Sequence, residues 1–183
     1  MRCVLSDLKI EKYPSVIARP YSLACEQDEQ WKDLLRFTFE NLMTVLASYA
    51  ASDLLNIYLS ARNSSEELEE GENDGGSQDT NELINILKNV PELKRIGLEQ
   101  MSLGKWAGVL RETTKVLEKY SDHSFIPELA KLFQPVSGNE LWKNIDTLIS
   151  IRNQDAHGAI TQPGQLKKEL KSRQDILDNI LRK

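Results

Sequence analysis

Three residues in the last third of the chain have the types and spacing that could act on a phosphodiester. Arg152 and Asn153 are adjacent, and His157 follows four residues later. Arginine keeps its charge and presents a planar fork of N–H donors to phosphate oxygens. Histidine, with an ordinary pKa of about 6.5, can take up and release protons near neutral pH. Arg152 would therefore stabilise a phosphate in the transition state, His157 would transfer protons, and Asn153 would position water, ribose or the histidine.

A predicted helix over residues 139–156 holds these side chains at its end. Apolar residues recur at spacings of three and four along it, and Arg152 falls in line with that apolar face. Asn153 and His157 are four apart and share a neighbouring face, and Gly158 is suited to a left-handed cap. We therefore expect three polar groups to gather at one helix end.

The pattern Arg152-Asn153-x-x-x-His157 resembles the R-x4-6-H motif of the HEPN superfamily, the higher eukaryote and prokaryote nucleotide-binding domains. Further residues that fit the resemblance are Pro20-Tyr21 before the first long helix, Glu40 inside it, and Ser102-Leu103-Gly104-Lys105-Trp106 before a later helix. They look similar to the N-terminal helical domains of bacterial conflict and signalling proteins. The resemblance covers residues 14–160 thinly and residues 141–158 well.

The resemblance implies an all-helical protein, frequently dimeric, with an RNA-cleaving site where two copies of the motif meet. It implies RNA as a partner and neither a cofactor nor a metal. Since one chain supplies one such Arg and His pair, a composite site requires a homodimer. A regulatory or antitoxin protein is a further partner of such toxins. Here, however, His157 is followed by Gly158-Ala159, without the tyrosine two places after the histidine that marks antitoxin-modified HEPN toxins.

The same residues also fit a purely structural role. An arginine in a last helical turn interacts favourably with the helix C-terminus, and a histidine before Gly158 can bond the final carbonyls. Two functions of different class therefore follow. One is a metal-independent endoribonuclease of a bacterial toxin or defence system. The other is a non-catalytic dimerisation or sensor module of a larger conflict or signalling protein.

Four other residues are candidates for supporting roles. Glu40 lies in a predicted helix, where its carboxylate would orient Arg152 or the site histidine; the alternative is a solvated glutamate. Lys167, Lys168 and Lys171 give the last predicted helix a basic side. Such a side is usually a solvated face, but it could also hold an RNA backbone through phosphate contacts.

The elements that must position these residues are helices, so we predict an all-α bundle forming a single domain over residues 1–183. Pro14 and Pro20 interrupt the N-terminal residues, which favours an irregular arm over 1–25. The stretch 62–80 has almost no apolar content and two adjacent glycines, which predicts a flexible acidic loop. The helices expected to build the core cover residues 26–61, 103–119, 139–156 and 165–181.

The charge balance neither supports nor excludes RNA binding. The formal net charge is −5, but seven acids gather in the loop and, without them, the balance becomes +2. These acids are Glu66, Glu67, Glu69, Glu70, Glu72, Asp74 and Asp79. The folded part can therefore carry local basic patches.

Cysteine usage and hydropathy favour a cytoplasmic protein without membrane contacts. Cys3 and Cys25 have no metal-ligand spacing and no Cys-x-x-Cys pattern, which predicts reduced thiols. The first residues lack the apolar core of a signal peptide. No run of uninterrupted apolar residues reaches the roughly 18–20 of a membrane span.

Overall fold

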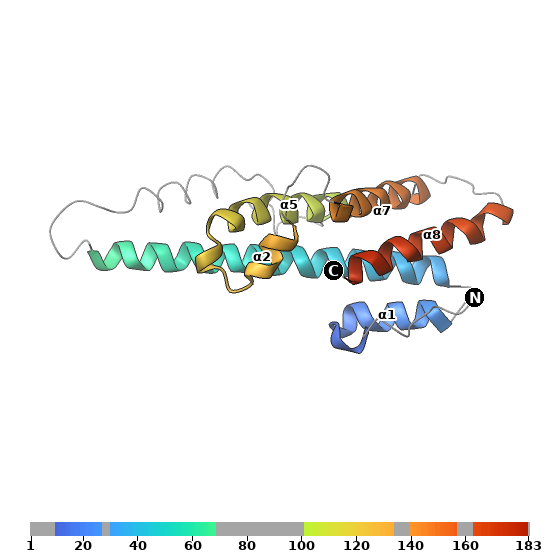
Figure 1. The fold of residues 1–183 in the computed structure, drawn as a ribbon, viewed down its shortest axis with the longest axis horizontal. Coiled ribbons are helices and arrows are strands. Elements are labelled where there is room, and N and C mark those ends of the chain that lie inside the picture. The colour runs from blue at the N-terminus through green and yellow to red at the C-terminus, as the bar shows by residue number, and fades with distance from the viewer. Residues whose placement is uncertain (1–9, 27–29, 69–100, 134–139, 157–162, 183) are drawn as a thin grey trace. The chain divides into compact units, whose positions relative to one another are not determined.

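The computed structural model describes residues 10–26, 30–68, 101–133, 140–156 and 163–182. Across these ranges the secondary structure is helical and includes no strand, which confirms the predicted all-α fold (Figure 1). The α-helices are α1 (Ser15–Glu26), α2 (Trp31–Leu68), α5 (Leu103–Lys119), α6 (Pro127–Leu132), α7 (Glu140–Ala156) and α8 (Pro163–Leu181). Two short 3-10 helices are η2 (Ile10–Lys12) and η3 (Ser121–His123).

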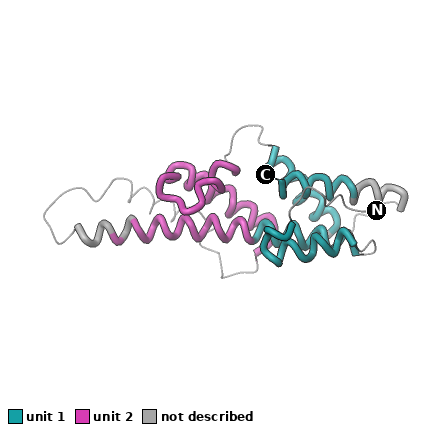
Figure 2. The backbone as a smooth tube through the Cα atoms, turned by 60° about the horizontal axis from the view of Figure 1, so that its bottom comes forward, with its two compact units in different colours: residues 1–44, 136–183 teal, residues 45–135 magenta. Residues whose placement is uncertain are grey.

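The chain divides into two compact units, coloured separately in Figure 2. The first unit comprises residues 1–44 and 136–183, and the second comprises residues 45–135. Helix α2 contributes its residues up to Thr44 to the first unit and the others to the second. All candidate site residues named from the sequence belong to the first unit.

The first unit combines α1, the beginning of α2, α7 and α8, and each helix places apolar side chains in the interior. Buried positions recur at helical spacing, as the amphipathic pattern of the sequence requires. Burying a large aliphatic or aromatic side chain contributes roughly 1.5–3 kcal/mol. The buried apolar side chains of the first unit, including Ile10 of η2, are Ile10, Ile17, Tyr21, Ala24, Leu35, Phe39, Leu42, Met43, Leu141, Trp142, Ile145, Leu148, Leu177, Ile180 and Leu181.

Helix α1 begins at Ser15 and occupies the last part of the segment for which the sequence predicted an irregular arm, residues 1–25, so that prediction is wrong there. The helix contains Pro20 in its interior, where proline is intrinsically unfavourable. Ile17 and Tyr21 are both only 1% exposed. Their burial on one face stabilises a helix that local propensity opposes. Residues 1–9 of the predicted arm lie outside the described residues.

A hydrogen bond from α2 replaces the backbone hydrogen bond that Pro20 cannot make within α1. A proline has no N–H, so it cannot donate to the carbonyl of Val16 four residues before it. That carbonyl instead accepts a hydrogen bond at 2.7 Å from the side-chain amide of Asn41 on α2. The proline thus leaves an acceptor on α1 that a neighbouring helix satisfies.

Two tyrosines connect the N-terminal elements to the end of α8. The Tyr21 hydroxyl donates to the Asp178 carboxylate, and the Tyr13 hydroxyl donates to the Leu181 carbonyl. Burial raises the pKa of Tyr21 well above its ordinary value, and the bond to Asp178 adds to the shift. Burial also raises the pKa of Asp178, although the hydrogen bond from Tyr21 opposes this change.

Helix α2 extends further than the sequence predicted. The expected helix covered residues 26–61 and the expected loop covered 62–80, whereas α2 begins at Trp31 and continues to Leu68, and Glu26 belongs to α1. Residues 62–68 contain no glycine or proline and include good helix formers such as glutamate; the first glycine is Gly71. The prediction of a loop is therefore wrong for its first residues, and its remainder lies outside the described residues.

By length and composition alone, the part of α2 from Lys32 to Ser60 could cross a membrane, with a mean hydropathy of 1.3 in its most apolar window. This helix meets a criterion based on mean hydropathy, although it contains no uninterrupted apolar run long enough to span a membrane. Of that window, 39% is buried inside the structure. The central helix of a water-soluble bundle passes the same test, so this single helix is weak evidence for a membrane.

The second unit contains the remainder of α2 with α5, η3 and α6. Helix α5 begins after Ser102, whose hydroxyl oxygen accepts a hydrogen bond from the Lys105 N–H at 3.4 Å. Its range matches the predicted helix 103–119. The apolar interior of this unit consists of Ala47, Ala50, Leu54, Ile57, Leu103, Ala107, Val109, Leu110, Val116, Leu117, Leu129, Ala130 and Phe133.

Asp53 organises the connection between α5 and α6. It is buried on α2, at 3% exposure. Its carboxylate accepts hydrogen bonds from the Ser124 hydroxyl, from the Phe125 N–H at 2.9 Å and from the Ile126 N–H at 3.3 Å. A buried carboxylate needs such donors, and the loop needs an acceptor for its N–H groups.

Helices α7 and α8 agree with the sequence prediction within two residues at each end. Helix α8 begins at Pro163, where the missing N–H of proline costs nothing in a first turn. Cys25 differs from its prediction because it is disulfide-bonded. The prediction of two reduced thiols is wrong, since separation along the sequence carries no information about distance in space. Cys3, the other cysteine of the chain, lies outside the described residues.

Candidate functional site

Arg152, near the C-terminal end of α7, contacts Glu40 on α2. The arginine Nε donates a hydrogen bond to Glu40 Oε1 at 3.1 Å. The contact that the sequence suggested between these residues is therefore present. The two side chains are 36% and 29% exposed, so water screens the pair and its net stabilisation is at most about 1 kcal/mol. Its main effect is to fix the direction of the guanidinium.

Asn153 is exposed beside Arg152. Its Oδ1 atom lies 3.5 Å from Arg152 Nη1, a long and weak hydrogen bond. Within the described residues, Arg152 Nη2 makes no hydrogen bond. The guanidinium is thus anchored through Nε while its terminal nitrogens retain capacity for an anion.

The other predicted site residues are only partly described. Helix α7 ends at Ala156, so His157 lies outside the described residues, as does its relation to Arg152. Lys167 and Lys168 belong to α8, but their side chains are also outside the described part. Lys171 is exposed on α8.

Asp155 is a residue that sequence reasoning missed. Arg173 of α8 donates to it through Nη1 at 2.6 Å and through Nη2 at 3.3 Å. Lys32 of α2 forms an ion pair with it at 2.9 Å. The three helices of the candidate site are thereby joined through one carboxylate, which is only 12% exposed.

A signal for Asp155 did exist in the sequence. An acid in the last turn of a helix faces the negative end of the helix dipole, which is unfavourable unless cations lie nearby. Burial raises the pKa of Asp155, but hydrogen bonds and charge from Arg173 and Lys32 outweigh it, so the pKa is lowered overall. The carboxylate is therefore ionised near neutral pH and holds both cations.

A pocket lies among α2, α7 and α8, entirely within the first unit. Its empty volume is about 390 Å³, part of which is open to solvent. The apolar lining consists of Leu35, Phe39, Leu148, Ile151 and Leu177. The charged lining consists of Lys32, Arg36, Arg152, Arg173 and Asp155. The four cations pair with three acids, since Arg36 binds Asp33 and Arg152 binds Glu40, so the hollow has apolar walls and an excess of one positive charge.

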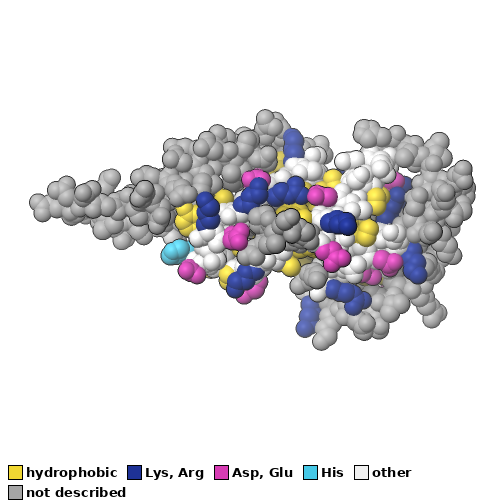
Figure 3. All heavy atoms as spheres, turned by 45° about the horizontal axis from the view of Figure 1, so that its top comes forward, with side chains coloured by type: hydrophobic (Ala, Val, Ile, Leu, Met, Phe, Trp, Pro, Cys, Tyr) yellow, Lys and Arg dark blue, Asp and Glu magenta, His cyan; other side chains and the backbone are white. Residues whose placement is uncertain are grey.

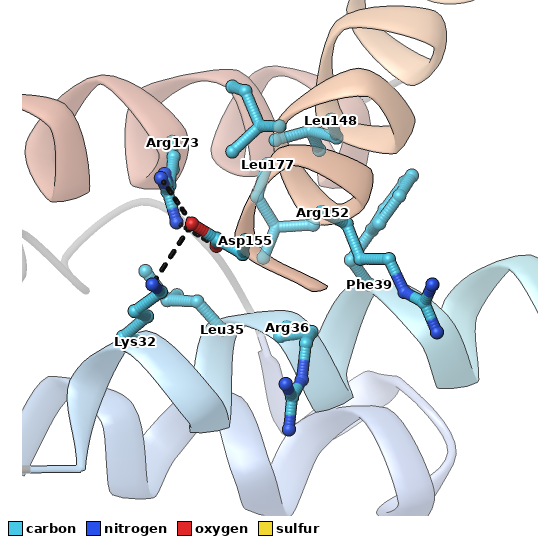
Figure 4. Close-up of a pocket in the computed structure, with 10 residues that line it drawn as sticks. Lys32, Leu35, Arg36, Phe39, Leu148, Arg152, Asp155, Arg173 and Leu177 are labelled. Carbon is cyan, nitrogen blue, oxygen red and sulfur yellow. Dashed lines mark hydrogen bonds and ion pairs between the residues drawn. The ribbon is translucent and has the colours of Figure 1, made fainter. Parts of the chain in front are cut away.

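Figure 4 shows how the charged groups are distributed around the pocket. Asp155 points toward Lys32 and Arg173 on one side. The guanidinium groups of Arg36 and Arg152 extend away from the centre, so their aliphatic stems face the pocket. The arrangement separates a cluster of two cations and one acid from two arginines at the rim.

The face drawn in Figure 3 carries no extended field of one sign among its described residues. In Figure 3, lysine and arginine side chains alternate with acids on the visible face. In the described ranges, no group of three or more His, Cys, Asp or Glu side chains could hold a metal ion. The positive pocket is thus the most distinctive charged feature of the first unit.

The sequence Asp122-His123-Ser124 does not form a catalytic arrangement in the structure. His123 is exposed at the end of η3, whereas the Ser124 hydroxyl donates to buried Asp53. The serine proton is thus directed to a structural carboxylate and not to an imidazole.

No family model, curated protein or solved structure matches the chain. The resemblance to the HEPN superfamily accordingly rests on the sequence motif.

Proposed function

We propose that this protein is a metal-independent endoribonuclease of the HEPN type, belonging to a bacterial toxin or defence system. The observation that supports this function best is the state of Arg152. Glu40 anchors it through Nε, Asn153 lies beside it, and it borders a positively charged pocket. An arginine whose Nη2 makes no hydrogen bond within the described residues, at the edge of this pocket, is suited to bind a phosphodiester.

The chemistry assigns one role to each motif residue. The ribose 2′-oxygen attacks phosphorus as its proton passes to a base, and the bond from phosphorus to the 5′-oxygen breaks as that oxygen is protonated. Arg152 stabilises the growing negative charge on the phosphate. His157 transfers protons, and Asn153 positions the ribose or the imidazole. The products are a 2′,3′-cyclic phosphate and a free 5′-hydroxyl.

A homodimer completes this mechanism. The reaction needs one group that accepts a proton and another that donates one, whereas each chain provides one motif histidine. Two copies of the motif at a symmetric interface supply both groups. Light scattering at micromolar concentration should report twice the chain mass of 20.9 kDa, and a strict monomer would leave the composite site without its second half.

RNA cleavage in EDTA tests the proposal directly. Purified protein is incubated with varied single-stranded and stem-loop RNAs, and the 3′-ends of the products are identified. Arg152→Ala and His157→Ala should each reduce the rate at least about 100-fold, the scale of losing an acid–base or charge-stabilising group. Arg19→Ala, an exposed position on α1, is the matched control and should cleave normally.

The alternative is a non-catalytic dimerisation or sensor module. The contacts that favour it are the ion pairs of Arg152 and Asp155, which join α2, α7 and α8 as a scaffold would require. A wild-type protein that is dimeric but leaves all RNAs intact, in EDTA and in magnesium, would support this module. We also propose a cytoplasmic location. The Cys25 disulfide bond is the feature that argues against it, because disulfides are rare in the cytosol.

A further inference from the structure

The pocket among α2, α7 and α8 is lined by four cations, whose ion-pair partners are three acids, Asp155, Asp33 and Glu40. Lys32 and Arg173 both bind Asp155. Arg36 makes an ion pair with Asp33 three residues earlier at 3.3 Å, and these side chains are 41% and 64% exposed. Exposed pairs of this kind contribute little, so an anion at the rim can compete for Arg36 at small cost.

The interior of the pocket is suited to a flat apolar group. Leu35, Phe39 and Leu148 are buried, with exposures between 4% and 7%, and they hold fixed positions on α2 and α7. One edge of the pocket is polar, where the Asp155 carboxylate binds Arg173 and Lys32. Apolar walls with a few placed donors and acceptors are typical of small-ligand sites.

We propose that this pocket receives one nucleobase of the RNA, with the adjacent phosphate held at the rim by Arg36 and Arg152. A nucleobase has apolar faces for the leucine and phenylalanine walls and a polar edge for Asp155 and Arg173. The phosphate meets two guanidinium groups that extend outward (Figure 4). The choice of a nucleotide, over other anions with an apolar body, rests on the proposed function.

This arrangement gives the enzyme a preference for the base beside the cleaved bond. Arg152 contacts the reacting phosphate, and Ile151, its neighbour in sequence, lines the pocket. The base that enters the pocket therefore fixes the register of the strand on the catalytic arginine. Cleavage should be selective for one base at that position.

Nucleotide binding to the full-length protein is the first test. Nucleoside 3′- and 5′-monophosphates are titrated by calorimetry and by NMR, with the unphosphorylated nucleosides and inorganic phosphate as separate probes. At least one monophosphate should bind more tightly than both its nucleoside and phosphate, with shifts at Leu35, Phe39 and Leu148. Arg36→Gln should weaken it about 10-fold, the loss of a charged hydrogen bond.

Two further variants distinguish binding in the pocket from attraction by the overall charge of the protein. Arg19→Gln removes the same charge from α1, away from the pocket lining, and should change the affinity less than about twofold. Ile151→Phe fills the pocket, and circular dichroism checks that it folds. It should abolish monophosphate binding and the base preference of cleavage.

The outcomes separate this inference from the proposed function. If RNA is cleaved without base preference and no monophosphate binds, the pocket assignment is overturned and the nuclease stands. If a monophosphate binds with the expected Arg36 and Ile151 dependence while RNA stays intact, the pocket stands and the nuclease is overturned. Binding of phosphate as tight as that of every monophosphate would overturn the base pocket.

Discussion

Removing Asp155 should destabilise the candidate site far more than removing an acid with a similar partner on the surface. Asp155→Ala deletes two hydrogen bonds with Arg173 and an ion pair with Lys32. Breaking a fully buried pair costs about 3–5 kcal/mol. Here Asp155 and Arg173 are 12% and 13% exposed, whereas Lys32 is 41% exposed. Because the buried pair with Arg173 contributes most, we expect Asp155→Ala to lower the unfolding free energy by about 2–3 kcal/mol.

Asp33→Ala is the matched control in the same unit. Asp33 pairs with Arg36 at 3.3 Å but is 64% exposed, so its removal should cost no more than about 0.5 kcal/mol. In thermal unfolding followed by circular dichroism, Asp155→Ala should lower Tm by about 5–10 °C. Equal shifts for the two variants would refute the argument that burial, and not pairing alone, sets the energy.

The pH dependence gives a second check on the same residue. Asp155 has a folded-state pKa below its ordinary value of 3.8. Its stabilisation is therefore fully present above that value and is lost as the pH falls through the lower folded-state pKa. The stability difference between wild type and Asp155→Ala should be constant near neutral pH and shrink below about pH 4.

Three other changes test contacts outside the candidate site. Asp53→Ala should lower the unfolding free energy by about 3 kcal/mol, since it leaves loop N–H groups without their acceptor; a loss equal to that of exposed Asp122→Ala would contradict this. Asn41→Ala should lower the unfolding free energy by about 1 kcal/mol when Pro20 is present. The loss should be smaller in a Pro20→Ala background, because the N–H of residue 20 can then donate to the Val16 carbonyl. A double-mutant cycle with zero coupling energy would refute this. Burial raises the pKa of Asp178, so its ionisation is unfavourable in the folded state. The stability of Asp178→Asn relative to wild type should therefore increase as the pH rises from about 4 to 7. A stability difference between the two proteins that does not depend on pH would refute this.

Local features of the sequence were sufficient to predict the helical fold and, within two residues, the limits of α5, α7 and α8. Periodic apolar residues are such a local feature, so they can be read without knowledge of distant contacts. The position of Arg152 and Asn153 near the C-terminal end of α7 was likewise predicted from local sequence. The same local evidence failed at Pro20, where propensity opposed a helix that burial stabilises.

Which polar residues meet depends on how the helices pack. Asp155 and Arg173 are 18 residues apart in sequence, and Arg152 and Glu40 are 112 apart. No periodicity encodes such pairs, because they depend on how helices pack against one another and on which charges lose contact with water. The sequence therefore supplied Arg152 and suggested Glu40 as its partner, while packing brought the two together and added Asp155 and the pocket beside them.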